Sequence, residues 1–255
     1  MNWAIDLDGV VWLAGRPLKG SGEAVAKLRD AGERVVFLTN NSGPLVSEHL
    51  ERLSAAGIDA SADELVTSAQ AAAHLLRPST KVAVVGDKGL YEALAEVGAQ
   101  VVPAGSRPEA VLVGRKVALD YEELSAAAND IRGGARFVAT NTDATFPVAS
   151  GELLPGAGAL VAFIATASGR EPEVAGKPHE AMAELVRERC GGVDVMVGDR
   201  ADTDGLFAKR VGARFGLVLS GVTTKADLPV TPAPELVAED LLDLVQRWLD
   251  RAQSP

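Results

Sequence analysis

Short apolar runs alternate with stretches of helical periodicity along this chain, and the two patterns predict strands and helices in turn. Alternation of this kind is typical of βα units around a mostly parallel sheet, so the sequence predicts an α/β fold. The predicted strands cover residues 3–5, 34–38, 65–67, 81–86, 110–113, 137–140 and 195–197. The predicted helices cover residues 22–31, 45–56, 68–77 (capped by Ser68), 121–132 and 235–252, and a further helix carries Leu90, Leu94 and Val97.

An inserted unit is predicted between residues 79 and 172. The strand and helix pattern begins again after Pro78 and continues through this whole block. The block is too long for a loop in a compact domain and long enough to form a small α/β domain. We therefore expect a core made of residues 1–78 and 173–255, with a second domain at 79–172 inserted into it.

Two carboxylates, Asp6 and Asp8, stand where the first predicted strand gives way to a loop at Gly9. Alternate residues of a strand point to the same side, and the C-terminal edge of a parallel sheet is where α/β proteins build their sites. A divalent cation relieves the repulsion between neighbouring carboxylates, and hard oxygen ligands favour Mg²⁺, which in turn binds phosphate. Taken alone, the pair is equally compatible with an acidic turn after an edge strand.

A hydroxyl and two amides follow the predicted strand 34–38, at Thr39, Asn40 and Asn41. Together with the backbone N–H groups of a turn, such side chains are suited to hold phosphate oxygens. An ordinary turn is the alternative interpretation of this segment when it is considered by itself.

Two further segments complete the pattern. Lys177 precedes Pro178 at a predicted junction between a loop and a helix, where an ammonium group can offset developing negative charge. Asp199 and Asp204 follow the predicted strand 195–197 and supply more carboxylates for a metal. Each segment alone is compatible with a solvated turn, but four of them in order at strand ends favour a site that handles phosphate.

The segments DLDGVVW, FLTNNS, GKPHE and GDRADTD, the last followed by LSGVTT, resemble the signature segments of the haloacid dehalogenase superfamily of phosphotransferases. The similarity is to its NagD-like, para-nitrophenylphosphatase-like subfamily and extends from Asp6 to about Val222. It implies a Rossmann-like core with a parallel sheet, an inserted α/β cap and Mg²⁺ as cofactor. Gly43-Pro44 depart from the pattern, because relatives often carry Arg or Ser there, so no arginine contact from that loop is expected.

The resemblance also implies a role for each motif residue. Asp6 is the expected nucleophile that forms an aspartyl-phosphate, and Asp8 is the expected general acid and base. Mg²⁺ is expected at Asp6, the backbone carbonyl of Asp8 and Asp199, with Asp204 orienting a metal-bound water. Lys177, with Thr39, Asn40 and Asn41, is expected to stabilise the phosphoryl group.

A polar, turn-rich segment at residues 141–147 is similar to the substrate-specificity loop of capped relatives. Asn141, Asp143 and Phe146 are the predicted substrate contacts in it, although an ordinary turn is the alternative. The expected substrates are small phosphomonoesters such as glycerol phosphate or phosphoglycolate, with para-nitrophenyl phosphate as an artificial one. A phosphomutase, a pyridoxal phosphate or nucleotide phosphatase, and a non-catalytic binding protein are the alternatives.

Composition narrows the class of protein further. A net charge of −10 over 255 residues argues against a nucleic-acid partner. The chain contains no run of about 18 apolar residues, so no membrane span is predicted. Its N-terminal segment lacks the basic residues with which a secretion signal begins. The single cysteine, Cys190, is predicted to be structural, and His49 and His74 to be packing or surface residues. We therefore expect a cytoplasmic enzyme that acts on a small phosphorylated metabolite. If it forms a homo-oligomer, we expect the copies to associate through the cap.

Overall fold

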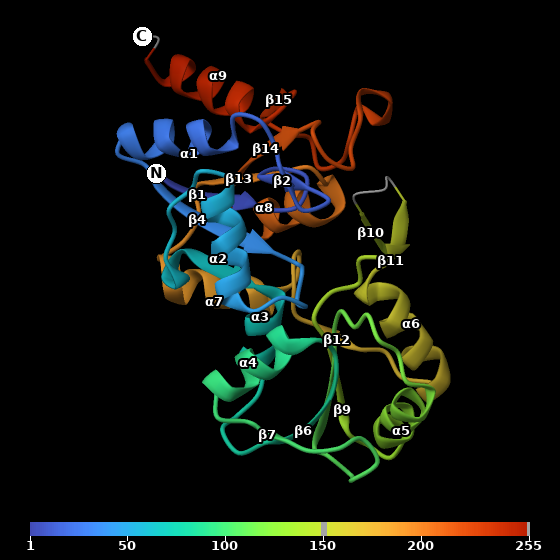
Figure 1. The fold of residues 1–255 in the computed structure, drawn as a ribbon. Helices are drawn as coiled ribbons and strands as arrows, with labels where there is room; N and C mark the ends of the chain where they lie inside the picture. Colours follow the sequence, from blue (N-terminus) through green and yellow to red (C-terminus); the bar gives the residue numbers. More distant parts are fainter. Residues whose placement is uncertain (149–151, 254–255) are drawn as a thin grey trace.

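The computed structural model of the chain describes residues 1–148 and 152–253. It contains two parallel sheets, each flanked by helices, and both ends of the described chain lie beside the first sheet (Figure 1). The α/β fold predicted from the sequence is therefore confirmed. Residues 149–151, 254 and 255, which the domain prediction also included, lie outside the described residues.

The first sheet has six parallel strands in the order β15-β14-β13-β1-β4-β5. Their bounds are β1 Asn2–Asp6, β4 Arg34–Thr39, β5 Leu65–Thr67, β13 Val195–Gly198, β14 Arg214–Val218 and β15 Leu236–Ala238. A short hairpin, β2 Trp12–Leu13 and β3 Arg16–Pro17, follows β1.

Helices cover both faces of the first sheet. On one face α1 packs against α9, and on the other α3 packs against α7 and α7 against α8 (Figure 1). The bounds are α1 Ser21–Asp30, α2 Val46–Ala55, α3 Ser68–His74, α7 Glu180–Cys190, α8 Leu206–Val211 and α9 Leu241–Gln253. Two 3₁₀ turns, η1 Ala62–Glu64 and η3 Lys225–Asp227, and one turn of π-helix, η2 Ala201–Gly205, complete this part.

The central strand β1 explains why the sheet is apolar on both sides. Trp3 and Ile5 are buried against α1 and α9, whereas Ala4 is buried on the opposite face with α3 and α7. A parallel sheet covered on both faces needs apolar residues at successive positions, as the run Trp3-Ala4-Ile5 provides. The same strand carries Asp6 to the C-terminal edge of the sheet.

The second sheet has five parallel strands in the order β12-β9-β8-β6-β7. Helices α5 and α6 pack on one face of it and α4 contributes to the other (Figure 1). The bounds are β6 Lys81–Val85, α4 Lys88–Glu96, β7 Gln100–Val101, β8 Ala110–Val113, α5 Tyr121–Arg132, β9 Arg136–Ala139, α6 Ala157–Ser168 and β12 Glu173–Val174. A hairpin, β10 Thr145–Pro147 and β11 Leu153–Pro155, projects between β9 and α6.

The structure corrects four local predictions. The helix predicted at 235–252 begins only at Leu241, because residues 236–238 pair as the edge strand β15 with β14. The N-cap of α3 is Thr67, whose hydroxyl accepts from the Gln70 N–H, and not Ser68. The helix predicted at 68–77 ends at His74, and residues 173–174 pair with β9, so the second sheet extends past residue 172.

Among the helices that the structure describes, none has the length and apolar character needed to cross a bilayer.

Candidate active site

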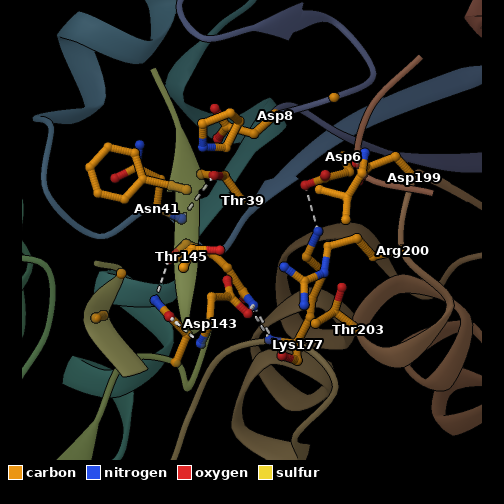
Figure 2. A pocket seen from close by; sticks show the side chains of 18 of the residues that line it. Asp6, Asp8, Thr39, Asn41, Asp143, Thr145, Lys177, Asp199, Arg200 and Thr203 are labelled. Carbon is orange, nitrogen blue, oxygen red and sulfur yellow. Dashed lines mark hydrogen bonds and ion pairs between the residues drawn. The ribbon is translucent and has the colours of Figure 1, made fainter. Parts of the chain in front are cut away.

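A single pocket gathers the strand ends of the first sheet and the edge of the second. Asp6 ends β1, Thr39 ends β4 and Asp199 directly follows β13, so all three reach the same edge. In the view of Figure 2, Asp8, Thr39 and Asn41 stand on one side of the pocket, opposite Asp6, Lys177 and Asp199. The lining also includes Gly9, Leu13, Asn40, Arg115, Asn141, Asp143, Thr145, Phe146, Pro147, Gly156, Ala157, Arg200, Thr203 and Val222.

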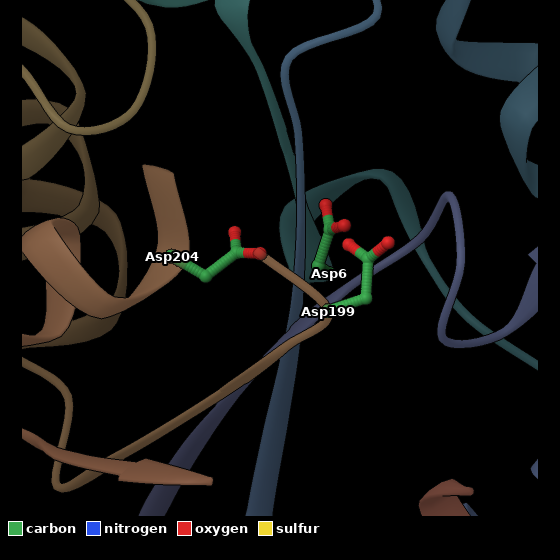
Figure 3. Close-up of side chains that lie close together, drawn as sticks. All are labelled: Asp6, Asp199 and Asp204. Atoms are coloured by element: carbon green, nitrogen blue, oxygen red, sulfur yellow. The ribbon is translucent and has the colours of Figure 1, made fainter. Parts of the chain in front are cut away.

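Three buried carboxylates converge at the base of this pocket. One oxygen each of Asp6, Asp199 and Asp204 lies within 4.8 Å of the others, and Figure 3 shows the three side chains turned toward a common point. Lys177 bridges two of them, with Nζ 2.6 Å from Asp6 Oδ1 and 2.7 Å from Asp204 Oδ1. One ammonium therefore faces a cluster of three carboxylates and pairs with only two of them, which favours a further positive charge in the cluster.

Burial controls the protonation of these groups. Burial raises the pKa of the Asp6 carboxyl well above its usual range, although Lys177 acts against it. Burial and then the neighbouring Asp204 carboxylate raise the pKa of Asp199 to about 7. Burial also opposes the charged form of Lys177, but Asp204 and Asp6 outweigh it and raise the pKa of its ammonium. The cluster thus holds more negative charge than its surroundings stabilise.

Asp199 is the carboxylate with spare coordinating capacity. Its Oδ2 accepts from the Val222 N–H at 2.5 Å, but its buried Oδ1 has no hydrogen-bond partner among the described residues. Glycines at 9 and 221 make room for it, since a Cβ at either position would lie 2.4 Å or less from Oδ2. A buried oxygen without a donor is costly, and a divalent cation shared with Asp6 and Asp204 would satisfy it.

Asn40 holds the lysine in place. Its Oδ1 accepts from the Lys177 N–H at 2.8 Å and its Nδ2 donates to the Lys177 carbonyl at 3.1 Å. Its second amide hydrogen faces Asp143 Oδ1 at 3.5 Å. The sequence predicted that Asn40 binds phosphate. In the structure its side-chain amide is hydrogen-bonded to the Lys177 backbone, a partner that no local sequence pattern indicates.

Thr39 and Asn41 form the turn at the end of β4, next to β1. The Thr39 hydroxyl accepts from the Asn41 N–H at 3.0 Å, and Asn41 Oδ1 accepts from the Gly43 N–H at 3.3 Å. Both residues line the pocket, as the sequence prediction required of groups that hold phosphate oxygens. Ser42 turns away from the pocket to join the second sheet, accepting from the Arg115 N–H at 3.0 Å and from the Thr140 hydroxyl at 3.1 Å.

Asp8 is separated from the carboxylate cluster and has its own support. Its Oδ1 accepts from the Trp12 indole N–H at 3.0 Å, and Trp12 stacks on the buried ring of His49 with centroids 6.5 Å apart. Burial raises the pKa of the Asp8 carboxyl, while the Trp12 hydrogen bond lowers it by a smaller amount. A half-exposed carboxyl with a raised pKa is suited to give and take a proton at the mouth of the pocket.

The predicted substrate contacts of the second unit also line the pocket, with different surroundings. Asn141 is buried, and its Nδ2 donates to the Asn40 carbonyl at 2.6 Å while its Oδ1 accepts from the Asp143 N–H at 3.1 Å. Burial raises the pKa of the half-buried Asp143. Phe146 faces Arg115, whose Cζ lies 4.7 Å from the ring centroid.

Three residues that shape the site were absent from the sequence prediction. Arg200 lines the pocket and is held by Asp202 through two hydrogen bonds of 3.1 and 2.9 Å. Trp12 supports Asp8, and its place four residues after Asp8 in a tight turn is the signal that was available. Arg115 reaches the pocket from the second sheet, and only the docking of the two sheets reveals it.

Comparison with known proteins gives two family matches and several close relatives. A model of the haloacid dehalogenase-like hydrolases matches residues 3–100, and a HAD-hydrolase-like model matches residues 174–244. D-glycerol 3-phosphate phosphatase of Mycobacterium tuberculosis is 38% identical over 252 residues, which cover 95% of this chain and 70% of that protein. Dihydroxyacetone phosphatase of Corynebacterium glutamicum is 35% identical over 257 residues, which cover 98% of this chain and 92% of that protein.

Solved structures agree with these relatives. A p-nitrophenyl phosphatase from Archaeoglobus fulgidus superposes with a TM-score of 0.88 at 32% identity, covering 96% of this chain and 98% of that one. A glycerol phosphate phosphatase from Mycobacterium tuberculosis, solved in complex with magnesium, gives a TM-score of 0.87 at 37% identity, covering 95% of this chain and 75% of that one. The similarity therefore includes both sheets and the pocket between them.

Proposed function

The chain belongs to the haloacid dehalogenase-like hydrolase family, in its NagD-like branch, and from this we propose that it is a phosphatase that hydrolyses small phosphomonoesters with Mg²⁺ as its cofactor. The observation that carries the proposal is the buried group of Asp6, Asp199 and Asp204 around the Lys177 ammonium. An uncompensated cluster of this kind is costly to bury, so it indicates a site kept for binding and chemistry.

Asp6 is the proposed nucleophile. A carboxylate oxygen of Asp6 attacks phosphorus, the bond from phosphorus to the leaving oxygen breaks, and an aspartyl-phosphate forms. Lys177 holds the Asp6 side chain at Oδ1 and fixes its direction. Since phosphoryl transfer depends mainly on positioning and charge stabilisation, a buried side chain with a fixed rotamer is suited to this role.

Asp8 is the proposed acid and base. In the first step its carboxyl group donates a proton to the leaving oxygen, which departs as an alcohol. In the second step the Asp8 carboxylate takes a proton from the water that attacks phosphorus, and inorganic phosphate and free Asp6 result. Burial raises the pKa of Asp8 and so favours its protonated form, which the first step requires.

Thr39 and Asn41 are proposed to bind the transferred phosphoryl group. Their side chains line the pocket that Asp6 also lines. Lys177 adds a positive charge next to the same group, and Asn40 acts through it by holding its backbone. Removal of one such stabilising group typically costs about 3 kcal/mol of transition-state stabilisation.

Asp6, Asp199 and Asp204 are proposed to hold Mg²⁺. The fit rests on the unpartnered Oδ1 of Asp199 and on oxygen donors alone, which is the ligand chemistry that Mg²⁺ prefers. When bound, the ion supplies positive charge that offsets the charge on the phosphate oxygens. The glycerol phosphate phosphatase solved with magnesium supports the same choice of metal.

The second sheet with its helices is proposed to act as a cap that limits the size of the leaving group. Phe146 and Arg115 come from this unit and line the same pocket as Asp6. A pocket roofed by a second unit suits small molecules. Relatives named for glycerol 3-phosphate and dihydroxyacetone phosphatase activity support a small polyol or triose phosphate as the substrate class.

Release of inorganic phosphate tests the proposal directly. The purified protein would be assayed with para-nitrophenyl phosphate, glycerol 3-phosphate and dihydroxyacetone phosphate, in Mg²⁺ and in excess EDTA. We expect phosphate release in Mg²⁺ only, and none above background from the Asp6→Asn variant, whose circular dichroism should match the wild type. Release that survives chelation, or an equally active Asp6→Asn variant, would contradict the proposed site, and a product that keeps the phosphate would indicate a phosphomutase.

A further inference from the structure

Arg115 is a cation of the second unit that points into the pocket of the first. It follows Gly114 at the end of β8, and its side chain lines the same pocket as Asp6, Asp8 and Thr39. Its backbone is anchored to the turn of the first unit, because its N–H donates to Ser42 Oγ at 3.0 Å. The guanidinium is therefore carried on a fixed strand end and not on a free loop.

Gly43 provides the space for this side chain. A Cβ at position 43 would lie 2.8 Å from Arg115 Nη1 and 3.3 Å from its Cδ. The first of these distances is shorter than real Cβ contacts allow, so any other residue at 43 would displace the guanidinium. The guanidinium also lies over the Phe146 ring, with Cζ 4.7 Å from the ring centroid. The space at Gly43 and the contact with the aromatic ring together favour one position of the planar cation.

Arg115 forms no ion pair within the described part of the chain. Of the three cations that line the pocket, Lys177 is paired with Asp6 and Asp204, and Arg200 with Asp202. Across residues 1–148 and 152–253, Arg115 has no carboxylate partner at ion-pair distance, and its buried Nε has no hydrogen-bond partner. Asp87 Oδ2 lies on the same side of Gly43 as the guanidinium but forms no ion pair with it, and Asp87 Oδ1 accepts from the Val117 N–H at 3.5 Å.

A planar guanidinium with free donors matches a carboxylate or a phosphate, which accept two parallel hydrogen bonds. The transferred phosphoryl group already has Lys177, Thr39 and Asn41 around it. Arg115 belongs to the unit proposed to contact the leaving group, and it lines the same pocket as Asp8, the proposed donor to the leaving oxygen. We propose that Arg115 is a specificity-determining residue that binds a second anionic group, carboxylate or phosphate, on the leaving group of the substrate.

This inference rests on the proposed phosphatase function. Within small phosphomonoesters it favours substrates with a second anion over the neutral polyol and triose phosphates for which the relatives are named. The protein carries a net charge of −10, so a doubly anionic substrate needs a local cation of this kind.

Three substrates with one carbon skeleton test the proposal. They are 3-phosphoglycerate with a terminal carboxylate, glycerol 1,3-bisphosphate with a terminal phosphate, and glycerol 3-phosphate with a neutral hydroxymethyl group. For the wild type in Mg²⁺ we expect kcat/KM at least about tenfold higher for one or both anionic substrates than for the neutral one. The arm with the larger preference identifies which anion the guanidinium binds.

Arg115→Gln should abolish this preference. We expect its kcat/KM to fall at least about tenfold on the favoured anionic substrate and less than threefold on glycerol 3-phosphate and para-nitrophenyl phosphate. Gly43→Ala should produce the same selective loss by displacing the guanidinium. Lys116→Gln is the matched control, because this neighbouring cation pairs with Glu123 and does not line the pocket.

Two outcomes would overturn the proposal: no preference in the wild type, or equal losses on all substrates in Arg115→Gln. Hydrolysis of para-nitrophenyl phosphate separates this result from the proposed function. If the wild type releases phosphate from it and only the anionic preference is missing, the role of Arg115 fails and the phosphatase assignment stands. If no substrate yields phosphate, the proposed function fails first.

Discussion

His49 makes the stability of the fold depend on pH. The side chain is fully buried in α2 against Trp12, and burial lowers its pKa from 6.5 to about 4. Between these values the unfolded chain binds a proton that the native His49 does not, so stability falls as the pH drops through this window. Protonation of His49 in the unfolded chain lowers the free energy of unfolding by about 3 kcal/mol below pH 4 and by about 2 kcal/mol at pH 5. Above pH 6.5, the pKa in the unfolded chain, this loss of stability is absent.

Urea unfolding at pH 7.5 and pH 5.0 measures this effect. We expect His49→Phe, which keeps an aromatic ring beside Trp12, to lose about 2 kcal/mol less than the wild type between the two pH values. His74→Gln is the control, since His74 lies at the surface end of α3, and its variant should keep most of the wild-type pH dependence. Comparing differences between pH values removes any change in packing that the substitution causes. A His49→Phe variant with the pH dependence of the wild type would refute the reasoning.

Three further predictions concern the site. Trp12→Phe removes the hydrogen-bond donor to Asp8, so we expect kcat for phosphate release to fall about fivefold, which is about 1 kcal/mol. An unchanged kcat would show that this hydrogen bond does not assist Asp8. Mg²⁺ should raise the Tm of the wild type by a few degrees in a thermal-shift assay but not that of Asp199→Asn, and equal shifts in both proteins would locate the metal elsewhere. Asn141→Ala should lower kcat/KM similarly on all substrates, because its amide is bonded to the Asn40 backbone, and a loss restricted to hydroxyl-bearing substrates would contradict this.

The parts of the site that lie at strand ends were predictable from the sequence. Asp6, Thr39 and Asp199 each end or follow a short apolar run, and parallel strands bring such ends to one edge. The strand and helix pattern also predicted the two sheets, because a buried strand and an amphipathic helix differ in period. These features depend on neighbours that are close in the sequence.

The features that were missed depend on distant partners. The apolar residues Leu236 and Val237 fit the helical pattern of α9, and only pairing with β14 makes them a strand. Asn40 binds the Lys177 backbone, a partner 137 positions away that its own turn does not indicate. Arg115 reaches the pocket because Gly43 leaves space for it, and neither residue predicts the other before the sheets are docked.

The position of β1 between β4 and β13 has a consequence for synthesis of the chain. Its partner β4 follows within the same N-terminal segment, but β13 is made only after every strand of the second sheet. On the ribosome, the second sheet is contiguous in sequence and can close while β1 still has one open edge, and such edges are templates for wrong pairing. The nascent chain is therefore most vulnerable to aggregation after β1 has paired with β4 and before β13 has been synthesised. Asp6 is translated before every strand except its own, yet it meets Asp199 and Asp204 only after the second sheet has been made, so the carboxylate cluster cannot form before β13 and η2 are synthesised.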